Sequence, residues 1–137
     1  MNPDSSPTLL HLTPRLDLGI LVGRWGFQPD PALLPAAYEA LTAEALATGC
    51  RFWLQDIRRR TFNDPQTTTW LLQTYFPDMA ARLGGRLYVA YLVGPTLHQL
   101  IVSQPDFILP AGYENTPHVV AFFGDEGAAM HWLQAQQ

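Results

Sequence analysis

The sequence predicts an α/β fold: one mixed β-sheet of about five strands, the first two of which form an antiparallel hairpin. Short apolar runs of strand length alternate with longer stretches whose apolar residues recur every three or four positions. The first two runs are joined so tightly that they must pair antiparallel. The chain has 137 residues, which is the size of one domain with a single good core.

The amino-terminal part is expected to hold a tail and the hairpin. Residues 1–7 are expected to form a flexible tail, and residues 8–137 a single domain. The first strand is expected over residues 8–12 and the second over residues 16–25, where apolar side chains alternate. Residues 13–15, Thr-Pro-Arg, predict the turn between them.

The first helix has clear start and end signals. Asp30 is a capping residue, and Pro31 is favoured at the first helical position, where its missing N–H is not needed. Gly49 is expected to end the helix in a left-handed conformation. Between these signals lies an apolar stripe with helical spacing: Leu34, Ala37, Tyr38, Leu41 and Ala45.

The next strand and helix follow the same logic. Residues 50–56 are mostly apolar without alternation, as expected for a strand covered on both faces in the middle of a sheet. Asp64 and Pro65 repeat the helix-start signal, and this second helix is expected to end at Gly84. Pro77 lies inside it and is expected to kink or split the helix, because proline lacks the N–H for an intrahelical hydrogen bond.

The carboxyl-terminal part alternates strand and helix signals. Strands are expected at residues 86–93 and 118–123, and a final helix after an aspartate cap within residues 124–126. Residues 96–117 predict a short helix followed by loops, because prolines and a glycine interrupt every longer pattern there. The expected order is therefore ββαβαβ(α)βα.

Composition argues against several classes of partner. The formal net charge is −4, and all eight basic residues are arginine, so general nucleic-acid binding is not expected. No apolar stretch reaches the roughly 20 residues that span a bilayer, so membrane insertion is not expected. The amino terminus lacks the regions of a secretory signal, and Cys50 is the single cysteine. These features predict a soluble cytoplasmic protein.

The chain lacks the usual motifs of catalysis and metal binding. Its histidines have no metal-ligand spacing, and its serines lie in no nucleophile motif. Cys50 is expected to be a small buried side chain, since no activating residue lies beside it. We therefore expect no metal, no cofactor and no catalytic residue.

The run from Asp56 to Arg60 is the densest group of positive charge in the chain. Alternate residues of an extended segment share a face, so Asp56, Arg58 and Arg60 are expected on one side, followed by Thr61. Two guanidinium groups and the amides that open the next helix would then hold a phosphate or a carboxylate. The alternative is that these arginines pair with Asp56, Asp64 or carboxylates of the helices on a solvated edge.

Aromatic residues are abundant for a chain of this length. Three of them, Trp25, Trp70 and Tyr91, are candidates for lining a pocket or a partner surface, because such rings dominate the energetics of interfaces. The alternative is that these rings pack in the core.

Several positions resemble the SpoIIAA-like group of the STAS superfamily, over a span from about Thr8 to Leu133. They are Trp25 near the end of the second strand, Asp56 at the end of the third, Trp70 early in the second helix, Ala90 and Tyr91 in the fourth strand, and the closing segment 126–133. The resemblance implies a small mixed sheet with its helices mainly on one face. Members of the superfamily include regulators that bind partner proteins and proteins with folds like lipid-carrying SEC14 domains.

One departure from the superfamily concerns regulation. In its anti-sigma-factor antagonists, a phosphorylatable serine follows an aspartate at the start of the second helix. Here Asp56 is followed by Ile57, and the nearest hydroxyl groups belong to Thr61 and to the threonines at 67–69. The resemblance therefore does not carry phosphorylation-driven partner switching over to this chain.

These features and the resemblance predict a non-catalytic cytoplasmic domain that binds a protein partner or forms a homodimer. The alternative is a carrier or sensor of a small anionic or amphipathic ligand, with Arg58 and Arg60 at the head group and Trp70 and Tyr91 beside the tail. Partner binding requires an exposed aromatic patch, and ligand binding requires a concave apolar pocket. An enzyme that uses Asp56 as a base is a third hypothesis.

Overall fold

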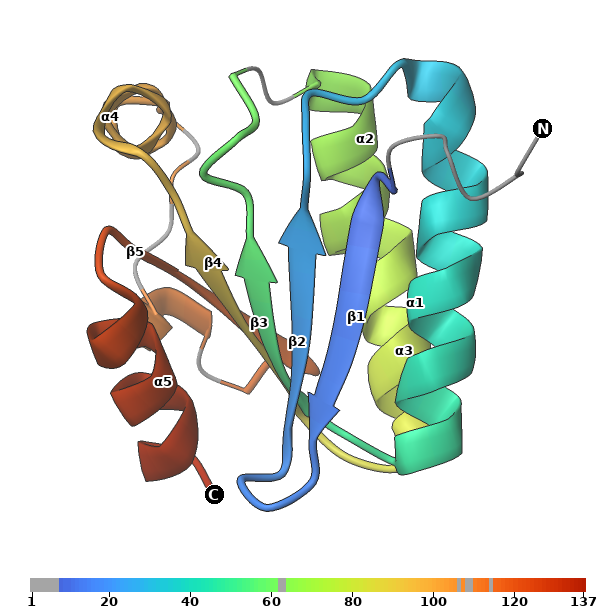
Figure 1. Cartoon of the computed structure of the whole chain (residues 1–137). Coiled ribbons are helices and arrows are strands. Elements are labelled where there is room, and N and C mark those ends of the chain that lie inside the picture. The colour runs from blue at the N-terminus through green and yellow to red at the C-terminus, as the bar shows by residue number, and fades with distance from the viewer. Residues whose placement is uncertain (1–7, 62–63, 106, 108–109, 114) are drawn as a thin grey trace, which may run out of the picture.

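A computed structural model gives the structure of residues 8–61, 64–105, 107, 110–113 and 115–137. The flexible tail expected at residues 1–7 lies outside the described residues. The described chain forms a twisted sheet with helices on both faces (Figure 1). The predicted α/β class is therefore confirmed.

The sheet has the strand order β1-β2-β3-β4-β5, so strands that follow one another in sequence are neighbours in space. β1 and β2 are antiparallel, and the other pairs are parallel. The predicted mixed sheet with an amino-terminal hairpin is confirmed, and β3 lies in its middle as predicted. The strands are β1 (Leu10–Arg15), β2 (Ile20–Trp25), β3 (Phe52–Asp56), β4 (Leu87–Leu92) and β5 (His118–Phe123).

The helices cover the two faces of the sheet unequally. α1 (Leu34–Thr48), α2 (Pro65–Trp70) and α3 (Phe76–Leu83) lie on one face, which we call the α1 face (Figure 1). α5 (Glu126–Ala135) lies on the opposite face, the α5 face. Parallel strands in sequential order need crossovers of one hand, which place the connecting helices on the same side of the sheet.

The third crossover, from β4 to β5, differs from the first two. Its described residues form α4 (Pro95–Val102) beyond the carboxyl end of β4 and the short 3₁₀ helix η4 (Pro110–Tyr113). Neither element is a long helix lying along β4 and β5. On the α1 face, α3 packs against both strands, and described residues of the third crossover add to this cover.

The first helix follows the sequence prediction closely, except at its start. All five stripe residues from Leu34 to Ala45 are buried, and Gly49 ends α1 with φ 70°. Asp30 Oδ1 accepts a hydrogen bond from the amide of Ala32 at 3.0 Å, but it caps a 3₁₀ turn, η2 (Pro31–Leu33), and the α-helix begins three residues later than expected. Cys50, just beyond the helix, is buried.

The hairpin turn lies later in the chain than predicted. β1 runs to Arg15 and β2 begins at Ile20, so the expected turn at residues 13–15 and the expected strand start at residue 16 are wrong. Pro14 is tolerated within β1 because this is an edge strand, where a missing donor costs little. Gly19, with φ 68°, supplies the left-handed residue of the turn that leads into β2.

The second helix is divided just before Pro77, as the expected split predicted: regular α-helical winding ends at Trp70 and resumes at Phe76. The chain passes from α2 through one π-helical turn, η3 (Leu71–Tyr75), directly into α3. In this turn the amide of Phe76 donates to the carbonyl of Leu71, five residues earlier. The wider turn leaves room for the proline ring at the start of α3, where its missing N–H is tolerated.

The α5 face has a smaller core of its own. Asp125 Oδ2 accepts the amide of Ala128 at 2.8 Å and so caps α5, as the aspartate signal predicted. Ala129 and Leu133 of this helix are fully buried against the sheet. The sheet contributes Ile20, Val22, Leu54, Ala90 and Leu92 to this core.

Candidate functional site

An apolar pocket lies on the α1 face between the sheet, the segment from α2 to α3 and the third crossover. Its volume is about 120 Å³. Tyr91 of β4 and Phe122 of β5 form its floor, and the segment from α2 to α3 forms one wall. Ligands in open α/β sheets bind most often at the carboxyl ends of the strands, and this pocket is at that end. Its apolar lining includes Ile57, Leu71, Leu72, Phe76, Ile101 and Val120.

A few polar groups interrupt the apolar lining. Thr68 reaches the pocket with a buried Oγ1 atom that has no hydrogen-bond partner among the described residues. Gln104 and the buried Tyr113 line the pocket on the side of the third crossover. A mostly apolar pocket with a small number of convergent polar groups is the usual form of a small-molecule site.

Tyr91 is a polar residue that β4 contributes to this pocket. Its ring stacks on Phe122 with 5.4 Å between centroids. Burial raises the pKa of Tyr91 well above its ordinary value, the nearby phenol of Tyr38 raises it further, and the positive charge of Arg60 lowers it. Tyr91 is therefore a neutral phenol at physiological pH and can donate a hydrogen bond.

Arg60 is a buried cation beside this pocket. It is 7% exposed, and its guanidinium lies 4.9 Å from the centre of the Trp25 ring. Its Nε atom has no hydrogen-bond partner, and no carboxylate among the described residues forms an ion pair with it. Burial raises the pKa of the neighbouring Tyr38, whereas the charge and hydrogen bonding of Arg60 act to lower it.

Gln55 links the buried arginine region to the sheet. It is 2% exposed in the middle of β3, and its Oε1 accepts the indole N–H of Trp25 at 2.9 Å. Its Nε2 atom has no partner among the described residues. Nε2 would also lie 2.8 Å from a Cβ atom at residue 23, so a larger residue there would have to displace the end of the Gln55 side chain.

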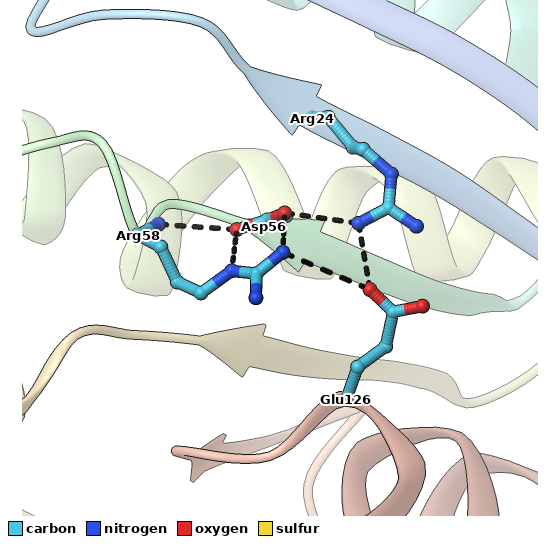
Figure 2. A network of polar contacts seen from close by, with 4 residues as sticks. All are labelled: Arg24, Asp56, Arg58 and Glu126. Carbon is cyan, nitrogen blue, oxygen red and sulfur yellow. Dashed lines mark hydrogen bonds and ion pairs between the residues drawn. The ribbon is translucent and has the colours of Figure 1, made fainter.

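A second group of polar residues, the ion cluster, lies on the α5 face at the same end of the sheet. It consists of Arg24, Asp56, Arg58 and Glu126 (Figure 2). Asp56 accepts from Arg24 Nη1 at 2.9 Å and from Arg58 Nε and Nη2 at 3.0 and 2.8 Å. Arg24 Nη1 also lies 2.7 Å from Glu126 Oε1, which ties the start of α5 to the sheet.

The ion cluster is electrostatically satisfied. Burial alone would raise the pKa of Asp56, but hydrogen bonds from Arg58 and Arg24 hold it below its ordinary value. The hydrogen bond from Arg24 is the main cause that lowers the pKa of Glu126. The cluster borders an open cleft of about 840 Å³ together with His11 and Arg59. Because each of its carboxylates already has an arginine partner, the cluster acts chiefly as a clamp between α5 and the sheet.

The structure divides the residues that the sequence grouped as an anion site. Asp56 and Arg58 lie together on the α5 face, whereas Arg60 is buried on the α1 face beside Trp25. The expected alternation is wrong beyond Asp56, because β3 ends there and the amide of Arg60 closes a turn onto the carbonyl of Ile57 at 3.0 Å. Thr61 is exposed, and its amide donates to Gln28 Oε1 at 2.8 Å.

The three candidate aromatic residues are also divided. Trp25 is buried and touches the ring of Tyr38, which in turn contacts Trp70. Trp70 is 40% exposed on the outside of α2, and among these three residues only Tyr91 lines the pocket. Sequence reasoning missed Thr68 and Gln55. The signal available for Gln55 was its polar side chain, which follows the apolar run 52–54 within the same predicted strand.

No family model and no curated protein matches this chain. Within the described residues, no helix combines the length and apolar character needed to cross a bilayer. The described histidine, cysteine and acidic side chains form no group of three or more that could hold a metal ion. The functional argument therefore rests on the pocket and on the polar groups around it.

Proposed function

We propose that the protein binds a small amphipathic molecule in the apolar pocket, as a carrier or a sensor, without transforming it. The observation that carries this proposal is the pocket itself, because an unfilled apolar space of about 120 Å³ sits at the carboxyl ends of β4 and β5. An engineered apolar cavity of similar size, about 150 Å³, stays dry and binds benzene. The space therefore suits a ligand with one ring or a short alkyl chain.

The residues that line the pocket support binding rather than catalysis. None of the described lining residues is a histidine, cysteine, aspartate, glutamate or lysine. General acid–base or nucleophilic chemistry most often depends on one of these side chains. Hydroxyl and amide groups, as on Thr68 and Gln104, are suited to orienting a ligand.

A titration of the protein with benzyl alcohol, followed by ¹⁵N–¹H NMR, tests the proposal. This probe has one ring and one hydroxyl group, and it should shift the amides of residues around the pocket. Ile101→Trp fills the pocket from α4 and should weaken binding at least tenfold. Leu100→Trp is the matched control, because Leu100 is 52% exposed on the same helix and should leave affinity within about twofold. Unperturbed pocket amides, or equal binding by both variants, would contradict the proposal.

Partner binding, the function that the resemblance implies, stays a prediction, as does the cytoplasmic location. The surface of the described residues supports partner binding less strongly than the pocket supports ligand binding. Trp70 is the single aromatic residue among the exposed large hydrophobic side chains of the described chain. The others are aliphatic and come from several separate elements: Leu16, Leu33, Leu46, Leu100 and Val102.

A further inference from the structure

The buried arginine on the α1 face identifies the chemical class of the ligand, and this inference rests on the proposed function. A buried cation costs several kcal/mol unless an opposite charge or good hydrogen bonds compensate it. Arg60 has the face of Trp25 and the hydroxyl region of Tyr38 beside it, but no carboxylate of the described chain. The Asp56 carboxylate, four residues earlier, is held by Arg24 and Arg58 on the other face.

Arg60 lies next to the pocket and not merely on the same face. The amide of Arg60 donates to the carbonyl of Ile57 at 3.0 Å, and the side chain of Ile57 forms part of the pocket wall. The charge of Arg60 also reaches the phenol of Tyr91, which lies in the pocket floor. Arg60 does not line the pocket itself, but it follows the pocket wall by one turn of backbone and its charge acts on the pocket floor.

Three polar groups of the pocket and of the sheet beside it have unused donors. No hydrogen bond joins the Tyr91 hydroxyl to another described residue, and Thr68 Oγ1 and Gln55 Nε2 are buried without partners among the described residues. A buried positive charge and unused donors on the same side of the sheet suit an acceptor that carries negative charge. We infer that the ligand is a small carboxylate, with its apolar body in the pocket and its carboxylate facing Tyr91 and Arg60.

The pocket limits the rest of the ligand. A volume of about 120 Å³ accommodates one six-membered ring or a chain of similar size, as the comparison with benzene indicates. A single guanidinium balances one negative charge, so a monoanion fits better than a phosphate dianion. The predicted class is therefore a monocyclic aromatic or short-chain carboxylic acid in its ionised form.

Sodium benzoate and benzamide distinguish a preference for a carboxylate from binding in the apolar pocket alone, because they have nearly the same shape and differ in charge. Titrated into the wild-type protein at pH 7, benzoate is expected to bind at least about tenfold more tightly than benzamide. Arg60→Met should remove this preference by weakening benzoate to the level of benzamide. Tyr91→Phe, which removes only a hydroxyl group, should weaken benzoate about fivefold and gives a second test if Arg60→Met does not fold.

Arg59→Met is the matched control, since Arg59 is an exposed arginine in the same turn. It should leave the affinity for benzoate within about twofold of wild type. Equal binding of benzoate and benzamide would overturn the carboxylate inference while leaving the ligand pocket in place, as would tighter binding of phenyl phosphate. Benzoate that shifts only amides of the ion cluster would overturn it as well. If neither probe shifts the pocket amides, both the inference and the proposed function fail.

Discussion

Arg58 grips the carboxylate of Asp56 with both its backbone and its side chain. The amide of Arg58 donates to Oδ1 at 3.1 Å, and its Nε and Nη2 donate to Oδ1 and Oδ2 at 3.0 and 2.8 Å. Arg24 approaches the same carboxylate from β2. Arg58, which the sequence suggested for anion binding, is thus paired with a carboxylate of the protein itself.

Asp56→Asn should lower the free energy of unfolding by about 2 kcal/mol, because charge-assisted hydrogen bonds to a buried carboxylate are among the stronger ones. Urea unfolding at pH 7 measures the change. Glu126→Gln is the control: its carboxylate is about two-fifths exposed, and its loss should cost less than about 0.5 kcal/mol. Equal effects of the two substitutions would show that the cluster is a surface network without a buried centre.

The contribution of Asp56 should also depend on pH. Its pKa in the folded protein lies below its ordinary value, so the unfolded state binds the proton first as pH falls. The stabilisation is present above the ordinary carboxyl pKa of about 3.9 and is lost as pH falls through the folded value. The difference in stability between wild type and Asp56→Asn should therefore shrink in acid.

The buried His118 should cause a second loss of stability, in a pH range above that of Asp56. Burial lowers the pKa of His118, and the charge of Arg86 lowers it further. The unfolded chain takes up a proton near pH 6.5 while the folded one resists it, so stability should fall between pH 7 and 5, by at most about 1.4 kcal/mol per pH unit. Its ring lies between Phe76 and Tyr113. Unfolding of His118→Leu should have a weaker pH dependence in this range, and an unchanged slope would contradict the prediction.

Two neighbouring threonines of α2 should respond in opposite ways to replacement by valine. Thr67 Oγ1 donates to Asp64 Oδ2 at 2.9 Å, so Thr67→Val should lower the free energy of unfolding by about 1 kcal/mol. Thr68 Oγ1 is buried without a partner among the described residues, so Thr68→Val should raise it by about 0.5 kcal/mol. Denaturant unfolding of both variants checks the prediction, which a destabilised Thr68→Val would contradict.

Arg60→Met should fold to a protein at least as stable as wild type. Methionine keeps the apolar stem against Trp25 and removes a buried charge that has no carboxylate partner in the described chain. Loss of the cation–π contact with Trp25 lowers the free energy of unfolding by about 0.5–2 kcal/mol, which opposes the stabilisation gained by removing the buried charge. Thermal or urea unfolding of the ligand-free protein measures the balance. A loss of more than about 2 kcal/mol would show that Arg60 is a structural residue, in contrast to a binding role.

Local signals in the sequence predicted most of the elements, though not the position of the hairpin turn, and did not predict the site. The caps at Asp30 and Asp125 and the stripe of α1 are properties of neighbouring residues, and the structure follows them. The direction of Arg60 depends on a tight turn after β3 that alternation along an extended chain does not include. The pocket is lined by residues of three separate segments, the sheet, the stretch from α2 to α3 and the third crossover, which become neighbours only when the whole fold is assembled.

The π turn η3 has a consequence for how this chain tolerates length changes. Such a turn holds one residue more than an α-helical turn would at the same place. Removing one residue from within Leu71–Tyr75 would therefore restore regular α-helical winding while α2 and α3 keep their orientation. The same deletion in the middle of α1, which is regular throughout, would turn the preceding part of its apolar stripe by about 100° away from the sheet. The turn before α3 is thus the place where this chain should best accept the loss of one helical residue.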